Sequence, residues 1–303
     1  HHRHEQFFLF IHYWDPHTPY LPPESHRGMF YDGDPKRASD PADRSLDELW
    51  QHPLGKAWRD TWFRSLGGRI TDADYVRALY DASVRYADDG IARMLDELTS
   101  LGLDDRTLVV VMGDHGECLG EHGVWYDHHG LYEENIHVPF IMRGPGLLPA
   151  GRRVERTVRT MDIAPTLLAL AGLEVPKEMD GSSMAPLFDA ALDAEYEGSD
   201  TVITAECTWQ AKWSLRTPAH KFIRARSIDF YGSPDRELYD RRADPGETTD
   251  IAMTTPGAAD DLEAELEGWI AREVGRLGRT GDPVTEQGRE KFADRWASAE
   301  AAG

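Results

Sequence analysis

Residues 109–139, VVVMGDHGECLGEHGVWYDHHGLYEENIHVP, join a short apolar run to a loop rich in histidines and carboxylates. The run ends directly at Gly113-Asp114-His115-Gly116. In α/β proteins the ends of strands carry much of the chemistry, because the backbone is rigid up to that point and the following loop can vary. This stretch therefore predicts a functional loop at the end of a buried strand.

Asp114 and His115 are the first candidates within that loop. One carboxylate oxygen and one imidazole nitrogen suit Mn²⁺, Zn²⁺ or Mg²⁺, whereas Ca²⁺ is less comfortable with nitrogen. The alternative is a strand-end aspartate that accepts loop N–H groups beside a solvated histidine. Residue types alone leave both interpretations open.

His17 lies in Asp15-Pro16-His17-Thr18-Pro19, which follows the apolar residues 7–14, FFLFIHYW. We expect residues 7–14 to form a buried strand. His17 is then either a loop histidine made rigid by its prolines or an imidazole that contacts an anion or a leaving oxygen. If residues 7–14 do form a strand, His17 and Asp114 can share one sheet edge.

His128 and His129 form a pair later in the loop. They can contact a substrate anion or bind a second ion, or one of them can simply pair with a carboxylate. His122 is the residue most suited to hydrogen-bond to a metal ligand and orient it, without touching the metal. We expect the remaining charged residues of the loop, Glu117, Glu121, Glu133 and Glu134, to be mostly solvated.

The rest of the pattern predicts an α/β protein. We expect a helix over 71–100 with Thr71 as its cap, strands over 107–112 and 138–143, and a helix over 161–171. Residues 22–70 indicate a long excursion with one or two short helices. From about residue 200 we expect four short antiparallel strands, at 201–208, 213–216, 221–226 and 237–240, and a helix over 260–277. The expected domains are a catalytic α/β domain at 1–195, a small α+β subdomain at 196–278 and a tail at 279–303.

Composition excludes several classes. The 303 residues carry a net charge of −21, which argues against a nucleic-acid partner. No apolar run approaches the ~20 residues of a membrane span. Cys118 and Cys207 fit no zinc spacing. The chain has no Gly-x-Ser-x-Gly, Walker or His-Glu-x-x-His motif and no Ser or Cys followed by x-Pro-x-Arg, so it shows no covalent nucleophile.

Several pieces in fixed order resemble the sulfatase family of the alkaline phosphatase superfamily. They are WDPHTPY at 14–20, YDASVRYADDGIARMLDEL at 80–98, TLVVVMGDHGECLGEHG at 107–123, HHGLYEENIHVPFIMRGPG at 128–146, MDIAPTLLALAGLEVP at 161–176, DGSSMAPL at 180–187, KFI at 221–223 and ELYDRRADPGE at 237–247. The resemblance implies an alkaline phosphatase-like mixed or parallel sheet with helices on both faces. A small C-terminal antiparallel sheet with a helix would follow.

The resemblance also implies site roles. Asp114 and His115 would be ligands of a single divalent cation, Ca²⁺ or Mn²⁺ before Mg²⁺ or Zn²⁺. His17 would contact the sulfate or the leaving-group oxygen, and His128 falls where many relatives have an anion-binding lysine. His17 and His128 would thus be catalytic, and His129 is the substitute for His128 if the register shifts by one.

In the family the nucleophile, a Cys or Ser converted to formylglycine, lies with an Asp-Asp pair of metal ligands before the His-x-Pro loop. We therefore expect the 303 residues to be a C-terminal portion that binds metal weakly and is inactive alone. The implied function is metal-dependent hydrolysis of a small-molecule or carbohydrate sulfate ester. His115 in place of the Asn of many sulfatases, and His128 in place of Lys, keep open a phosphonate monoester or phosphodiester hydrolase. A non-catalytic remnant is the third alternative. We expect a soluble protein, with the cytoplasm slightly favoured, while compartment and oligomeric state stay open.

Overall fold

The structure is a computed structural model that describes residues 4–36, 46, 49–50, 53–68, 70–227 and 231–288. It divides into two compact units. Among the described residues, the first comprises those up to Thr107 and Leu119–Asp127, and the second comprises Leu108–Cys118 and those from His128 onward. Part of the predicted excursion, residues 37–45, and the tail from residue 289 lie outside the described residues.

The long helix of the first unit is α4 (Ala73–Ser100), close to the predicted range. Asp72, rather than Thr71, caps it: the Asp72 carboxylate accepts a hydrogen bond from the Asp74 N–H at 3.1 Å. Asp72 suits this place because its backbone is extended while its side chain reaches the first free N–H groups. The helix buries one face, which includes Val76 and Leu79.

An aromatic core packs beside α4 in the same unit. It draws on α3 (Pro53–Trp58) and the π-helical turn Arg59–Phe63, while α1 (Glu24–Arg27) is a single turn whose His26 contacts Asp89 of α4. The ring of Tyr20 lies 5.1 Å from that of Trp62 and 6.1 Å from that of Tyr126, edge to face in both cases. The predicted short helices are thus present, and Trp62 belongs to the core.

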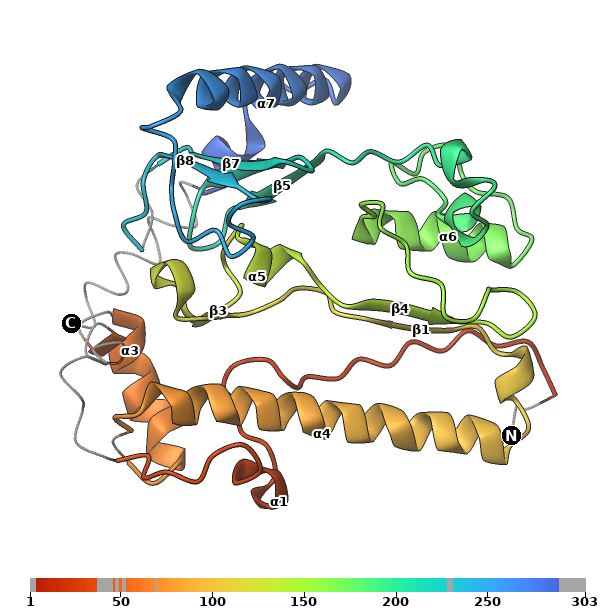
Figure 1. The fold of residues 1–303 in the computed structure, drawn as a ribbon, viewed down its shortest axis with the longest axis horizontal. Helices are drawn as coiled ribbons and strands as arrows, with labels where there is room; N and C mark the ends of the chain where they lie inside the picture. Colours follow the sequence, from red (N-terminus) through yellow and green to blue (C-terminus); the bar gives the residue numbers. More distant parts are fainter. Residues whose placement is uncertain are drawn as a thin grey trace. The chain divides into compact units, whose positions relative to one another are not determined.

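Residues 7–14 are extended but form no strand, so the prediction of a buried strand was wrong. The exposed fractions of Phe8, Phe10 and Trp14 are 83%, 75% and 62%. The segment runs beside α4 (Figure 1), and the Tyr13 ring lies against Gly90 of that helix. A strand needs hydrogen-bonded neighbours, and among the described residues no strand pairs with this segment.

The second unit begins with β1 (Val109–Met112), which pairs antiparallel with β4 (Phe140–Arg143). Both strands were predicted, and each is shorter than expected. Between them in the sequence lie β2 (Cys118–Leu119) and β3 (Trp125–Asp127), which pair as a short hairpin. Residues 119–127 of that hairpin are counted with the first unit, and the single-turn helix α5 (Glu133–Ile136) with the second. The predicted helix after β4 is α6 (Ile163–Leu170).

The C-terminal sheet is antiparallel, in the order β5-β6-β7-β8. Its strands are β5 (Val202–Glu206), β6 (Lys212–Arg216), β7 (His220–Ala225) and β8 (Arg236–Asp240). Leu215, Phe222 and Leu238 are opposite one another across three strands and form an apolar row. Helix α7 (Pro256–Arg276) lies beside this sheet (Figure 1), and its Leu266 and Ile270 belong to the same core. The predicted small antiparallel sheet with its helix is confirmed.

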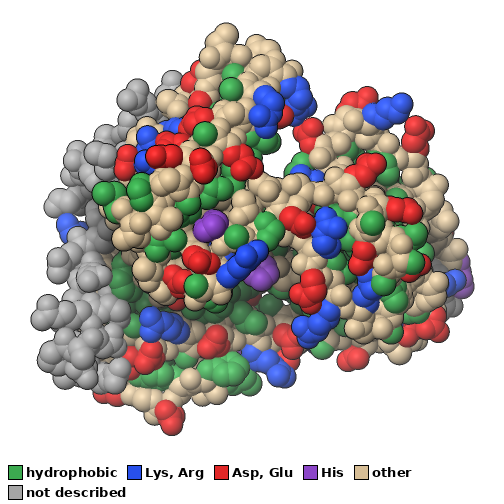
Figure 2. All heavy atoms as spheres, turned by 45° about the horizontal axis from the view of Figure 1, so that its top comes forward, with side chains coloured by type: hydrophobic (Ala, Val, Ile, Leu, Met, Phe, Trp, Pro, Cys, Tyr) green, Lys and Arg blue, Asp and Glu red, His purple; other side chains and the backbone are tan. Residues whose placement is uncertain are grey.

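In the part of the chain that the structure describes, no helix is long and apolar enough to span a bilayer. Acidic and basic side chains are intermixed on the face that Figure 2 shows. Cys118 and Cys207 are both free thiols. The Cys118 thiol is buried and donates to the Asn135 side-chain oxygen at 3.0 Å.

Candidate active site

Asp114 and His115 stand just past the end of β1, as predicted. The Gly113 N–H donates to the Pro139 carbonyl at 3.1 Å and continues the β1–β4 ladder by one step. Beyond it the Asp114 carboxylate turns back and accepts the His115 backbone N–H at 3.1 Å. The two side chains therefore begin at the last point that the strand pair holds rigid.

The imidazole of His115 is held in one tautomer. Its Nδ1 lies 2.9 Å from the Gly116 carbonyl oxygen, and a carbonyl can only accept, so Nδ1 carries the hydrogen. The lone pair is then on Nε2, as in histidines that bind metals through that nitrogen.

The pair fits a divalent cation. His115 Nε2 is 4.0 Å from Asp114 Oδ1. Ligand bonds of ~2.0–2.2 Å to nitrogen and carboxylate oxygen let both atoms touch one ion at that separation. The Asp114 side chain is 74% exposed, so it can turn toward an ion without leaving a buried partner.

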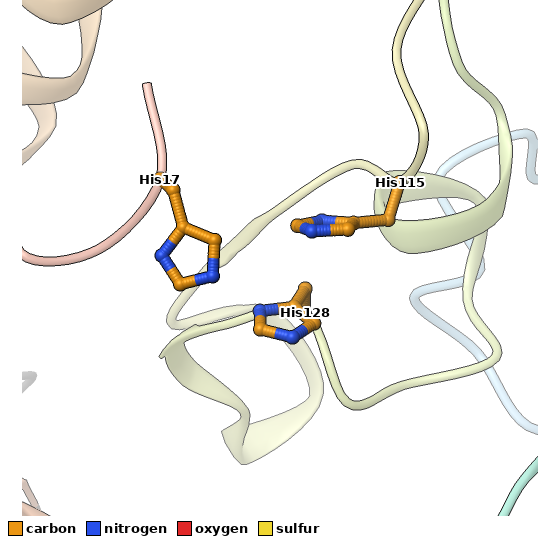
Figure 3. A group of neighbouring side chains, drawn as sticks. All are labelled: His17, His115 and His128. Carbon is orange, nitrogen blue, oxygen red and sulfur yellow. The ribbon is translucent and has the colours of Figure 1, made fainter. Parts of the chain in front are cut away.

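His128 and His129 extend this group within the second unit. The His115 and His128 rings stack with centroids 4.1 Å apart and planes 22° apart (Figure 3), and His129 lies 4.1 Å from His128. Two full positive charges at this distance repel by about 4 kcal/mol at an effective dielectric constant of 20. The three rings are therefore suited to act as neutral metal ligands, or to carry protons when an anion lies beside them.

His17 belongs to the first unit, where its own surroundings fix it. Its Nδ1 donates to the Thr18 carbonyl at 2.5 Å, and its ring stacks on Trp14 at 4.5 Å. Thr18 Oγ1 in turn donates to the Tyr126 carbonyl at 2.7 Å. His17 thus also carries its lone pair on Nε2. The structure brings Asp114, His115, His128 and His129 together in one unit, and the roles of all five residues stay predictions.

Glu133 is the principal residue that the sequence did not reveal. It was expected to be solvated, but its side chain is only 12% exposed and pairs with three cations. Arg216 lies at 2.9 Å, Lys221 at 2.7 Å and Arg241 at 3.2 Å. Burial raises the pKa of Glu133, but hydrogen bonds and charges from Arg216 and Lys221 outweigh it and lower that pKa to about 2.

Lys221 shares its charge with a second carboxylate, Glu247, at 3.1 Å. Glu247 also accepts the backbone N–H of Glu133 at 2.9 Å. Burial raises the pKa of Glu247, against the lowering effect of Lys221. The signal in the sequence was Lys221 next to the apolar pair Phe222-Ile223 in β7, because lysine is almost never fully buried unless it is paired.

A second buried network lies beside the first. Glu237 accepts hydrogen bonds from the hydroxyls of Tyr132 at 2.8 Å and Tyr239 at 2.7 Å. Lys212 lies 3.1 Å from the other oxygen of Glu237 and is 1% exposed. Burial and the Glu237 carboxylate both raise the pKa of Tyr239. Together the two networks attach the segment after His128 and His129 to the C-terminal sheet.

Comparison with known proteins identifies the family. Residues 1–173, more than half of the 303, match the sequence model of the family described as Sulfatase. The chain belongs to the sulfatase family. Residues 120–272 of this sulfatase chain also match the model described as N-sulphoglucosamine sulphohydrolase, C-terminal.

Individual similar proteins are also sulfatases by name or by the substrate they were solved with. The sulfatase chain is 34% identical over 184 residues to N-acetylglucosamine-6-O-sulfatase from Bacteroides thetaiotaomicron, across 57% of this chain and 31% of that protein. It is 27% identical to BT4656, solved in complex with its substrate D-glucosamine-2-N,6-O-disulfate, with a TM-score of 0.53, across 71% of this chain and 45% of that chain. The chain spans less than half the length of the curated relatives it matches.

The solved structures also confirm the alkaline phosphatase-like α/β fold class. The phosphonate monoester hydrolase of Silicibacter pomeroyi is 24% identical with a TM-score of 0.62, across 86% of this chain and 54% of that chain. At that identity the likeness concerns the fold alone.

Proposed function

We propose that the full-length protein hydrolyses sulfate esters with the help of one divalent cation. The observation that carries the proposal is the strand-end pair Asp114–His115, with donor atoms 4.0 Å apart, in a chain of the sulfatase family. Ca²⁺ or Mn²⁺ is the proposed ion, and the nitrogen of His115 favours Mn²⁺. When bound, such a cation draws charge from a sulfate oxygen and lowers the barrier to attack on sulfur.

The residues of this chain would bind and orient the ester. Asp114 and His115 would hold the cation, the first through an oxygen and the second through Nε2. The stacked ring of His128 would donate an N–H to a sulfate oxygen, a hydrogen bond that becomes stronger when the ring is protonated. His129 is the substitute for His128 in that role.

His17 is proposed to act at the leaving oxygen. For this the ring must first take a second proton on Nε2, which an imidazole can then give up near neutral pH to the departing alkoxide. The hydrogen bond to Thr18 and the stack on Trp14 would keep its Nε2 directed away from its own loop. The nucleophile is proposed to be a formylglycine from sequence outside these 303 residues, since the chain has no Cys or Ser followed by x-Pro-x-Arg.

The proposed substrates are carbohydrate sulfates. This follows from two relatives: one is named for the 6-O-sulfate of N-acetylglucosamine, and the other was solved with a disulfated glucosamine. A glucosamine 6-sulfate is therefore the first natural substrate to test, beside a general aryl sulfate.

A phosphonate monoester or phosphodiester hydrolase is the second candidate, favoured by His115 and His128 themselves. The test is a paired assay of the full-length protein with aryl sulfate and aryl phosphodiester substrates, beside His115→Ala. We expect the sulfate to react faster, and His115→Ala to lose that activity. Faster phosphodiester turnover would favour the second candidate. No turnover of either substrate would favour a non-catalytic remnant.

A further inference from the structure

The segment between β5 and β6, residues 207–211, is held in one shape by the residue before it. The Glu206 carboxylate accepts the backbone N–H of Thr208 at 2.7 and 2.9 Å and that of Gln210 at 3.0 Å. A carboxylate that receives several backbone N–H groups fixes the turn that provides them. The segment is therefore rigid enough to fix the position of the residues that it contacts.

What it contacts is the histidine pair. Gln210 Nε2 donates to the His129 carbonyl at 2.7 Å, across 81 residues of sequence. The Trp209 ring meets the His129 ring edge to face, with centroids 6.0 Å apart and planes 85° apart. One neighbour thus holds the His129 backbone while the other limits the rotation of its ring.

The burial of the Gln210 side chain costs free energy of folding. The residue is only 1% exposed, and its Oε1 is buried without a hydrogen-bond partner among the described residues. The amide cannot flip to relieve this, because Nε2 must face the carbonyl. An apolar side chain of the same size would avoid that penalty. The donor is therefore the feature that makes glutamine useful here.

The chain next to His129 is closely packed as well. A Cβ at Gly130 would lie 2.2 Å from the side-chain oxygen of the buried Asn135, so a larger residue there would force that side chain to move. Glycine leaves its own backbone free to turn. The segment therefore depends on outside contacts for its position, and the Gln210 amide is such a contact.

We propose that Gln210 is a positioning residue for the His128–His129 pair, and that Trp209 sets the ring orientation of His129. Because the His128 ring lies against that of His129, the orientation passes to both rings. The inference rests on the proposed function, in which this pair binds the sulfate group. Through this contact the C-terminal sheet would decide how the anion is held.

The test uses Gln210→Met, Gln210→Glu and a matched control, Trp213→Phe, in the full-length protein. Trp213 is a core residue of the same sheet whose indole N–H donates to Asp282 and whose ring meets that of Trp269 in α7. We expect Gln210→Met to lower kcat/KM for aryl sulfate about tenfold, the effect of ~1.4 kcal/mol. Trp213→Phe should change the melting temperature but not kcat/KM.

Gln210→Glu tests the donor role through the pH dependence of kcat/KM, which a purely structural role of Gln210 would leave unchanged. The buried carboxylate faces the His129 carbonyl and repels it, but once protonated it donates an O–H in place of the amide. Burial favours the neutral acid. Its kcat/KM relative to the parent protein should therefore rise as pH falls. An unchanged ratio across pH, or equal kcat/KM in Gln210→Met and the parent, would overturn the proposal.

Imidazole NMR signals separate this inference from the proposed function. In Gln210→Met the signals of His128 and His129 should shift, while in Trp213→Phe they should not. If the parent protein hydrolyses no sulfate ester but these shifts appear, the positioning stands and the proposed function fails. Unshifted signals beside normal sulfatase activity would contradict the positioning alone.

Discussion

At the scale of single residues, the tautomer of His115 connects the loop sequence to metal chemistry. The Gly116 carbonyl accepts a hydrogen bond from Nδ1–H of His115. Nε2 is therefore the atom that can bind an ion beside the Asp114 oxygen. Nitrogen is a better ligand for Mn²⁺ than for Ca²⁺, whereas an amide oxygen suits Ca²⁺. The residue at position 115 should therefore affect the relative affinity of the site for Mn²⁺ and Ca²⁺.

We predict that His115→Asn weakens Mn²⁺ binding by at least about tenfold, since even partners behind metal ligands change affinity by ~10–100-fold. Affinity for Ca²⁺ should fall less or rise. Titration of the metal-free full-length protein by calorimetry measures both. His137→Asn, at an exposed histidine of the same unit, is the control. Equal losses for the two ions would argue against His115 as a ligand.

The sequence was sufficient to place Asp114 and His115 just past the end of a strand, while their role as metal ligands stays a prediction. It was insufficient for Glu133. A glutamate in a polar loop looks the same whether it meets water or three cations, and those cations lie 83 to 108 residues further along the chain. Pairing over that distance is a property of the folded sheet and leaves no local pattern.

At the scale of elements, helix α5 is attached to the C-terminal sheet by charge. Glu133 and Glu247 share Lys221, which is completely buried. The removal of one member of a buried ionic group leaves the others uncompensated, which costs ~3–5 kcal/mol. The position of the histidine segment before α5 should depend on this cluster.

We predict that Lys221→Met lowers the free energy of unfolding by ~3–5 kcal/mol near neutral pH, because two buried carboxylates then face each other. Urea unfolding measures this. Lys177→Met, at an exposed lysine, is the matched control and should change stability little. If the two variants were equally stable, the cluster would contribute nothing.

The low pKa of Glu133 predicts a second effect. That pKa is about 2 in the folded protein, against 4.5 for the free group, so the unfolded chain takes up the proton first as pH falls. The resulting stability, on the order of 3 kcal/mol, is complete above about pH 4.5 and is lost as pH falls toward 2.

Unfolding measured between pH 2 and 6 should show this loss in the parent protein and much less of it in Glu133→Gln. Glu247, whose raised pKa works in the opposite direction, is present in both proteins. The difference between them therefore reports Glu133 together with its effect on Glu247, whose pKa the Glu133 charge helps to raise. Parallel pH curves would contradict the prediction.

Helix and strand positions followed from periodicity over most of the chain, including α4, α6 and the four C-terminal strands. Residues 7–14 were the exception. Their apolar character predicts burial, but a strand forms only where a neighbour supplies hydrogen bonds, and the structure describes no strand that does so for this segment. Local pattern could not supply that information.

At the scale of the whole molecule, the account depends on a metal-assisted reaction in the full-length protein. The chain supplies the strand-end pair and the histidine row, while it spans less than half the length of its curated relatives. Activity must therefore be measured on the full-length protein.

The most direct measurement is sulfate ester hydrolysis by the full-length protein after chelation and after metal is added back. The account predicts that chelation abolishes turnover of an aryl sulfate, and that Mn²⁺ or Ca²⁺ restores it in the parent protein. In Asp114→Ala and His115→Ala the same additions should restore little or nothing. Turnover that survives chelation, and that both variants retain, would contradict the central claim.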